Sequence, residues 1–180
     1  MLEKDNLNKI LEVFFDNPIQ EGGFQLRELS RKINVAPKSV KLYLEKLEKE
    51  KLIFKKILHN YPVYHANRDY DYFKFLKKIN TLKTIKESGL LDFLYDTCLP
   101  NVIIMFGSAS KGEDIMGSDI DLYLQCTEKK LILNKFKTKL KRKINIFFEK
   151  SFGKLSTELK NNIINGVILK GYLSVAQWKE

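Results

Sequence analysis

The sequence lacks long apolar runs and has only two cysteines, and each shortage excludes a class of protein. Its longest uninterrupted apolar run, from Val102 to Phe106, has five residues, whereas a membrane-spanning helix needs roughly 20. Cys98 and Cys126 lack the density of a disulfide scaffold and the spacing of metal ligands, so buried, reduced thiols are expected. The mixed charges of residues 1–6 are unlike those of a secretory signal. We therefore expect a cytoplasmic protein with no membrane partner.

Positive charge is abundant, and it is unevenly distributed along the chain. Lysine and arginine number 32 against 22 aspartate and glutamate, in a chain that is 44% hydrophobic and therefore apolar enough to fold. Residues 98–127 carry a net charge of −3, whereas residues 128–180 carry +9. Clustered carboxylates within a basic chain are expected where a cation is bound and a polyanion is attracted. A solvated, lysine-rich surface would have the same composition, so charge alone does not decide the function.

The first third of the chain has the pattern of three helices followed by a β-hairpin. Apolar residues recur at helical spacing from Leu7 to Phe15, and Pro37 suits the first turn of a later helix. A turn is predicted at 59–62, between two short β-branched and aromatic runs. The predicted elements, in order, are helices over 7–15, 27–33 and 37–51 and strands over 52–57 and 63–66.

This order of elements resembles the winged-helix domains of bacterial and archaeal transcription regulators, over about residues 5–66. The resemblance implies that the third helix and the hairpin meet the phosphates and base edges of DNA or RNA. The residues that it assigns to this contact are Lys38, Ser39, Lys41 and Tyr43 on the helix and Lys55 and Lys56 on the hairpin. Winged helices also dock proteins and form dimers, so a protein partner or a homodimer is an open alternative.

The predicted domains are a winged helix at 1–66, linking helices at 67–97 and a third part at 98–180. Apolar residues continue at helical spacing through the linking segment, and Ser88-Gly89 is predicted to break it into two helices.

The third part contains the residues with the clearest chemistry. An apolar strand over 102–106 ends at Gly107-Ser108, where the absence of a Cβ lets backbone N–H groups and the Ser108 hydroxyl approach a phosphate. Asp119 and Asp121 stand two apart on a second predicted strand, so their side chains share one face. Neighbouring carboxylates repel each other, and a divalent cation such as Mg²⁺ relieves that repulsion.

Gly-Ser followed by Ser-Asp-x-Asp-Leu, each beside an apolar strand, resembles the polymerase-β-like nucleotidyltransferases, most closely their minimal archaeal and bacterial members. The resemblance covers about residues 90–172 and implies an α+β fold with a mixed sheet and flanking helices. It implies that Gly107 and Ser108 hold the phosphates of a nucleoside triphosphate, together with Lys111 and Ser118. It also implies that Asp119 and Asp121 bind Mg²⁺ or Mn²⁺. Residues 162–172 correspond by position to the final helix of that group.

One position of this sequence differs from the residue pattern of that family. Catalytic members usually place a third carboxylate on a later strand, where it binds a second metal and deprotonates the attacking hydroxyl. Asn145 holds the matching position on the strand predicted over 143–149, and an amide cannot be a general base. Glu149 faces the same way, but four residues at about 3.3 Å each place it roughly 13 Å further along.

A basic, amphipathic helix is predicted over 129–143, between the second and third carboxylate positions. Its lysines could hold a triphosphate or a nucleic acid, or form only a solvated face.

Two functions follow from these residues. The first is a Mg²⁺-dependent nucleotidyltransferase that moves a nucleoside monophosphate from a triphosphate to a hydroxyl acceptor, with Asp119, Asp121 and Asn145 in its catalytic site. The second is a winged-helix transcriptional regulator whose degenerate transferase domain senses a nucleotide without turning it over. A helical partner protein is expected for the minimal members of the family. The sequence does not distinguish a protein, an RNA end or a small molecule as the acceptor.

Overall fold

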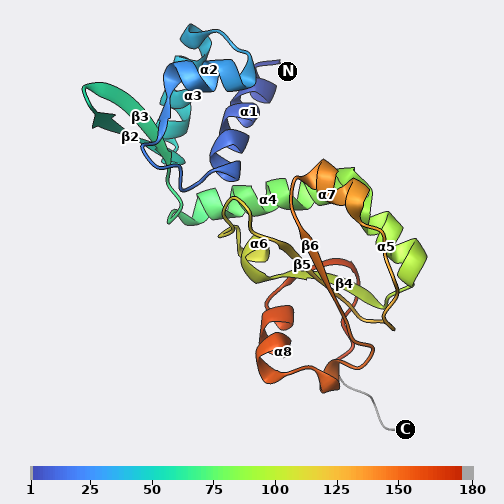
Figure 1. The fold of residues 1–180 in the computed structure, drawn as a ribbon. Coiled ribbons are helices and arrows are strands. Elements are labelled where there is room, and N and C mark those ends of the chain that lie inside the picture. The colour runs from blue at the N-terminus through green and yellow to red at the C-terminus, as the bar shows by residue number, and fades with distance from the viewer. Residues whose placement is uncertain (1, 176–180) are drawn as a thin grey trace. The chain divides into compact units, whose positions relative to one another are not determined.

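The structure is a computed structural model that describes residues 2–175 (Figure 1). The described residues form a mixed α+β protein with eight α-helices and two sheets. The chain divides into two compact units, Met1–Lys77 and Lys78–Glu180, with the division inside one long helix. In the described part of the chain, no helix combines the length and the apolarity needed to cross a membrane.

The first unit contains the three helices and the hairpin that the sequence predicts. Its elements are α1 (Leu2–Asp16), β1 (Phe24–Gln25), α2 (Leu26–Ile33), α3 (Pro37–Lys49), β2 (Ile53–Leu58), β3 (Tyr61–Ala66) and the start of α4 (Asp71–Ser88). The strands pair antiparallel in the order β1-β3-β2. The turn of the hairpin is shorter than predicted, because His59 and Asn60 both adopt a positive φ and reverse the chain in two residues. Buried side chains from all three helices, the strands and Phe73 of α4 form one core.

Helix α3 buries one side chain that was predicted to be exposed. Tyr43 is only 6% exposed and packs in the core, whereas Leu42 is 54% exposed. The reason is the helical period, since Val40, Tyr43, Leu44 and Leu47 stand at i, i+3, i+4 and i+7. The prediction that Tyr43 is exposed on this helix is therefore wrong. The other five residues predicted to contact nucleic acid lie on α3 and β2: Lys38, Lys41, Lys55 and Lys56 are exposed and Ser39 is partly buried.

The second unit is a four-stranded mixed sheet with helices on both faces. Its elements are the remainder of α4, then α5 (Leu90–Cys98), β4 (Val102–Phe106), α6 (Gly107–Lys111), β5 (Ile120–Leu124), α7 (Asn134–Leu140), β6 (Ile144–Phe148), a 3₁₀ turn (Phe152–Lys154), α8 (Thr157–Ile164) and β7 (Val167–Gly171). The strand order is β6-β5-β4-β7, with β5 parallel to β6 and the other pairs antiparallel.

Alternate residues of these strands enter two separate cores. Ile103, Ile120 and Leu122 face α5, α7 and the end of α4 on one side of the sheet. Ile104 and Tyr123 face the other side, where Ile163 of α8 packs. The period of two in a strand explains this division. Asp121 and Asn145 project toward the α8 side, because each stands an even number of residues from a side chain of that face.

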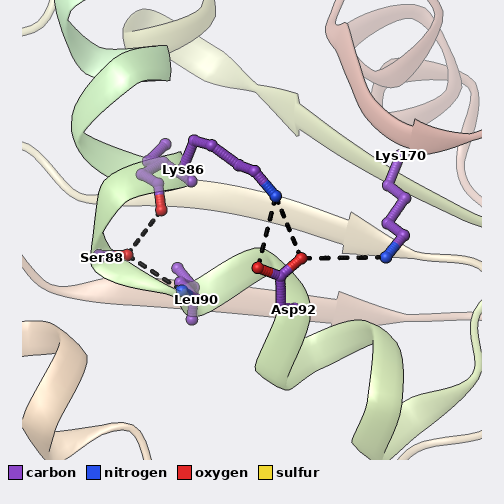
Figure 2. Close-up of polar contacts among 6 residues, drawn as sticks. Lys86, Ser88, Leu90, Asp92 and Lys170 are labelled. Atoms are coloured by element: carbon purple, nitrogen blue, oxygen red, sulfur yellow. Dashed lines mark hydrogen bonds and ion pairs between the residues drawn. The ribbon is translucent and has the colours of Figure 1, made fainter.

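The junction between α4 and α5 confirms the predicted break at Ser88-Gly89. The Ser88 hydroxyl donates to a carbonyl of α4 at 2.6 Å and accepts from the Leu90 N–H at 3.1 Å (Figure 2). Asp92, in the first turn of α5, pairs with Lys86 at 3.1 Å and with Lys170 of β7 at 4.0 Å. These contacts join both helices to the edge of the sheet.

The prediction of one final helix through residue 172 is wrong. Helix α8 ends at Ile164, and residues Val167–Gly171 form β7, which pairs antiparallel with β4. A Cβ on Gly166 would lie 2.7 Å from both Ile104 Cγ2 and the Met105 carbonyl, so glycine permits the close return of the chain to β4. Pairing along the edge of the sheet then satisfies the backbone of the β-branched segment that follows.

The basic helix predicted over 129–143 is also shorter, because α7 comprises only Asn134–Leu140. Leu131 and Leu133 of the segment before it pack on the core. Three lysines of residues 129–139 contact groups of the neighbouring helices. Lys129 Nζ donates to the Thr97 carbonyl near the end of α5, and Lys139 Nζ donates to the last carbonyls of α4. Lys135 lies over the rings of Phe93 and Phe136. These lysines therefore form hydrogen bonds with helix ends and cation–π contacts with aromatic rings.

The two cysteines are buried and free, as expected, but they are not isolated from each other. Cys98 ends α5 and Cys126 follows β5, and each thiol influences the pKa of the other. Burial raises the pKa of Cys98, and it raises that of Cys126 to about 11. Both thiols are therefore protonated and unreactive near neutral pH.

Candidate active site

The turn at Gly107 lies directly against Asp121. Gly107 has a φ of 72°, and a Cβ built on it would lie 2.6 Å from Asp121 Oδ2. The left-handed backbone and this close approach both require glycine. Phe106 pairs with Asp121 across β4 and β5, which explains how the end of one strand meets the start of the next. The sequence thereby brings a backbone turn and a carboxylate to the same edge of the sheet.

Asp119, Asp121 and Asn145 form the centre of the site. Asp121 and Asn145 are in register on the parallel strands β5 and β6, and Asp119 immediately precedes β5. The Asn145 side-chain nitrogen donates to Asp119 Oδ2 at 2.9 Å and to Asp121 Oδ1 at 3.1 Å. One oxygen of each carboxylate therefore lies within hydrogen-bond distance of a single point. The NH₂ end of the amide faces both acids because a carboxylate only accepts.

The remaining predicted phosphate ligands occupy the turn and the loop around this centre. Ser108 is partly exposed in the first turn of α6, and Lys111 is exposed at the end of that helix. The Ser118 hydroxyl oxygen accepts from the Ile115 N–H at 3.0 Å, so this side chain shapes the loop that leads to Asp119.

An arginine that the sequence analysis did not single out holds that loop in place. Arg142, which follows α7, pairs with Asp114 at 2.9 Å. Its side chain is 17% exposed and that of Asp114 is 6% exposed. The guanidinium also donates to the backbone carbonyls of Ser118 at 3.0 Å and Asp119 at 3.3 Å. The sequence feature that could have identified it is its residue type, since Arg142 is the single arginine among the basic residues of 128–180.

Two nearby groups are poorly suited to act as a general base. Glu149 follows β6, and its Oε1 accepts from the Ser151 N–H at 2.9 Å, which closes the turn after the strand. Tyr123 is fully buried, and its hydroxyl donates to the Glu149 carbonyl at 2.9 Å. Burial, with Glu149 nearby, raises the pKa of Tyr123 to about 12, so it stays protonated near neutral pH.

The oxygen ligands of the centre fit a small, hard cation. Asp119 and Asp121 already converge on one donor, and a rotation of the Asn145 amide would present its carbonyl oxygen to the same point. Carboxylate and carbonyl oxygens are the ligands that Mg²⁺ takes in proteins. Among residues 2–175, no group of three or more His, Cys, Asp or Glu is placed to hold a metal ion.

Comparison with known proteins identifies no relative of this chain. No protein-family model matches the chain, and searches of the curated proteins and of the solved structures find no match.

Proposed function

We propose that this chain is a Mg²⁺-dependent nucleotidyltransferase of the polymerase-β-like type, with a winged helix as its first unit. The observation that carries the proposal is the convergence of Asp119, Asp121 and Asn145 beside the Gly107 turn. In the sequence these residues are separated by up to 38 positions, yet they meet at one edge of the sheet. The mixed sheet of the second unit, with helices on both faces, supports the same proposal.

In this proposal each residue has a role that its environment allows. The Gly107–Ser108 backbone and the Ser108 hydroxyl bind the outer phosphates, next to Asp121. Asp119 and Asp121 hold the cation, which supplies positive charge against the phosphate oxygens. Arg142 orients Asp119 through the loop backbone. Catalysis then consists of positioning and charge neutralisation, because phosphoryl chemistry needs little covalent help from the protein.

Binding of a nucleoside triphosphate is expected to require Mg²⁺ or Mn²⁺, because the two carboxylates would otherwise repel the phosphates. Isothermal calorimetry with and without metal measures this dependence. The double variant Asp119→Ala/Asp121→Ala should bind no more tightly with metal than without it. Asp92→Ala, a carboxylate at the α4–α5 junction, is the matched control and should bind normally. Equal affinity of the unaltered protein with and without metal would remove the carboxylate assignment.

A nucleotide-sensing regulator is the second candidate, and one contact favours it. The Asn145 amide bridges the two acids by hydrogen bonds, so the site can exist with both carboxylates satisfied and without a third negative charge. Such a domain would bind the nucleotide without transferring it. The Asn145 variant described in the Discussion separates the two candidates.

The first unit is proposed to contact nucleic acid through α3 and the β2–β3 hairpin. Lys38 and Lys41 are exposed on α3, and Lys55 and Lys56 are exposed on β2. Binding should weaken steeply as salt increases, because each phosphate contact releases counterions.

The variant Lys38→Ala/Lys41→Ala should flatten the dependence of log affinity on log salt by about two units, about one for each lost phosphate contact. A filter-binding series over salt concentration measures the slope. Lys78→Ala/Lys83→Ala on α4 is the control of equal charge and should leave the slope unchanged. Binding that does not depend on salt would instead indicate that the unit docks a protein.

A further inference from the structure

The ring of Phe147 lies on the same face of the sheet as the candidate site. Phe147 follows Asn145 by two residues on β6, so both side chains project from one face of the strand. Its ring packs against that of Phe106 with centroids 5.4 Å apart and an interplanar angle of 62°. Phe147 is nevertheless 41% exposed, whereas Phe106 is buried. The buried ring therefore holds an exposed aromatic surface beside the carboxylates.

The order of the strands decides on which side of the site this ring lies. The Gly107 turn follows β4, the carboxylates belong to the start of β5, and Phe147 belongs to β6, across β5 from β4. In an in-line displacement the attacking and leaving oxygens stand on opposite sides of the phosphorus. If the pyrophosphate leaves toward the Gly107 turn, the acceptor approaches over β6, where Phe147 lies.

Positive charge accompanies the ring along the same strand. The Ile120 N–H donates to the Lys143 carbonyl at 2.9 Å, so the ladder between the two strands extends to Lys143. Lys143 therefore shares the face of Asn145 and Phe147, and it is exposed. Lys150 is exposed just after the strand. Stacking rings with nearby cations are the means by which proteins bind single-stranded nucleic acids, whose bases stack and whose phosphates attract lysine.

We propose that Phe147 is the stacking platform for the terminal base of a single-stranded nucleic acid whose 3′-hydroxyl is the acceptor, with Lys143 beside its phosphates. This inference rests on the proposed nucleotidyl transfer and names its acceptor class. The 3′-oxygen forms a bond to the α-phosphorus, and the bond from that phosphorus to the bridging oxygen of the pyrophosphate breaks. Pyrophosphate leaves with the electron pair, and the hydroxyl proton passes to water.

The test compares two 5′-labelled single-stranded oligonucleotides that differ only in the last nucleotide, which is normal in one and abasic in the other. Fluorescence anisotropy with the full chain and Mg²⁺ should show roughly 5- to 150-fold tighter binding of the oligonucleotide with a terminal base, the range expected for one stacked base. Phe147→Leu should abolish that ratio, and Phe147→Tyr, which keeps the ring, should preserve it. Lys143→Ala should weaken both oligonucleotides alike.

Failure of the inference and failure of the proposed function give different results. The inference alone fails if the unaltered protein binds the two oligonucleotides equally, or if Phe147→Leu leaves the ratio intact, while triphosphate binding still requires metal. Transfer to a tyrosine-containing protein, with none to the oligonucleotide, would assign the ring to a different acceptor. If the ratio depends on Phe147 but no triphosphate binds, the proposed transfer fails and the ring is only a binding surface. Circular dichroism of both Phe147 variants confirms that they fold.

Discussion

Asn145→Asp is expected to increase nucleotidyl transfer by roughly 10²–10⁴-fold, the contribution of a positioned general base. The reason lies in the geometry, because the side-chain nitrogen of Asn145 stands 2.9 Å from Asp119 Oδ2 and 3.1 Å from Asp121 Oδ1. An aspartate there would add a third carboxylate at the same point, able to bind metal and to accept the proton of the acceptor. Transfer from a labelled triphosphate, measured with Mg²⁺ or Mn²⁺, reports the change.

The same variant has a second signature that does not depend on the acceptor. Without metal, three carboxylates replace two acids bridged by an amide, so the melting temperature should fall below that of the unaltered protein. Added Mn²⁺ should raise it again, and by more than in the unaltered protein, because a ligand that binds only the folded state stabilises it.

Glu149→Gln is the control for the choice of strand position. A nucleotide-sensing regulator should gain activity from near zero with Asn145→Asp, whereas an enzyme that uses another base should gain little. A large loss with Glu149→Gln, and no gain with Asn145→Asp, would assign the third position to Glu149 despite its hydrogen bond to the Ser151 N–H. No response to either change, in a protein that transfers nucleotide, would show that a third carboxylate is unnecessary here.

Arg142→Met is expected to lower the free energy of unfolding by about 3–5 kcal/mol, the range for removing one partner of a buried ion pair. Asp114 is almost completely buried, and the guanidinium that faces it at 2.9 Å would be lost. The backbone carbonyls of Ser118 and Asp119 would lose the same donor. Urea denaturation, followed by circular dichroism, measures the change.

Two further variants separate the ion pair from the volume of the side chain. Asp114→Asn combined with Arg142→Met should lower the free energy of unfolding by less than the sum of the two single changes. The reason is that Asp114→Asn removes the buried negative charge whose arginine partner Arg142→Met has removed. Lys141→Met, at the exposed position next to Arg142, should be close to neutral. Equal losses from Arg142→Met and Lys141→Met would show that the ion pair does not stabilise the loop.

The positions of most helices and strands follow from local patterns in the sequence. Apolar spacing placed α1, and Ser88-Gly89 marked the break between α4 and α5. An apolar run placed β4, and the Asp-x-Asp motif placed β5. The burial of Tyr43 could also have been predicted from the sequence, since its spacing from Val40 and Leu47 is helical. These features depend on residues a few positions apart, so the sequence alone contains them.

The tertiary structure decided what depends on residues far apart in the chain. The strand at 167–171 forms because β4 offers a free edge and Gly166 admits the close approach, neither of which a local pattern contains. Lysines of the basic segment contact helix ends and rings more than 30 positions away. The bridge from Asn145 to both acids and the pairing of Arg142 with Asp114 arise in the same way. Sequence by itself determined which residues carry charge and how most segments fold. The meeting of those charges required the register of β5 with β6, because contacts between distant segments form only when strands pair and cores close.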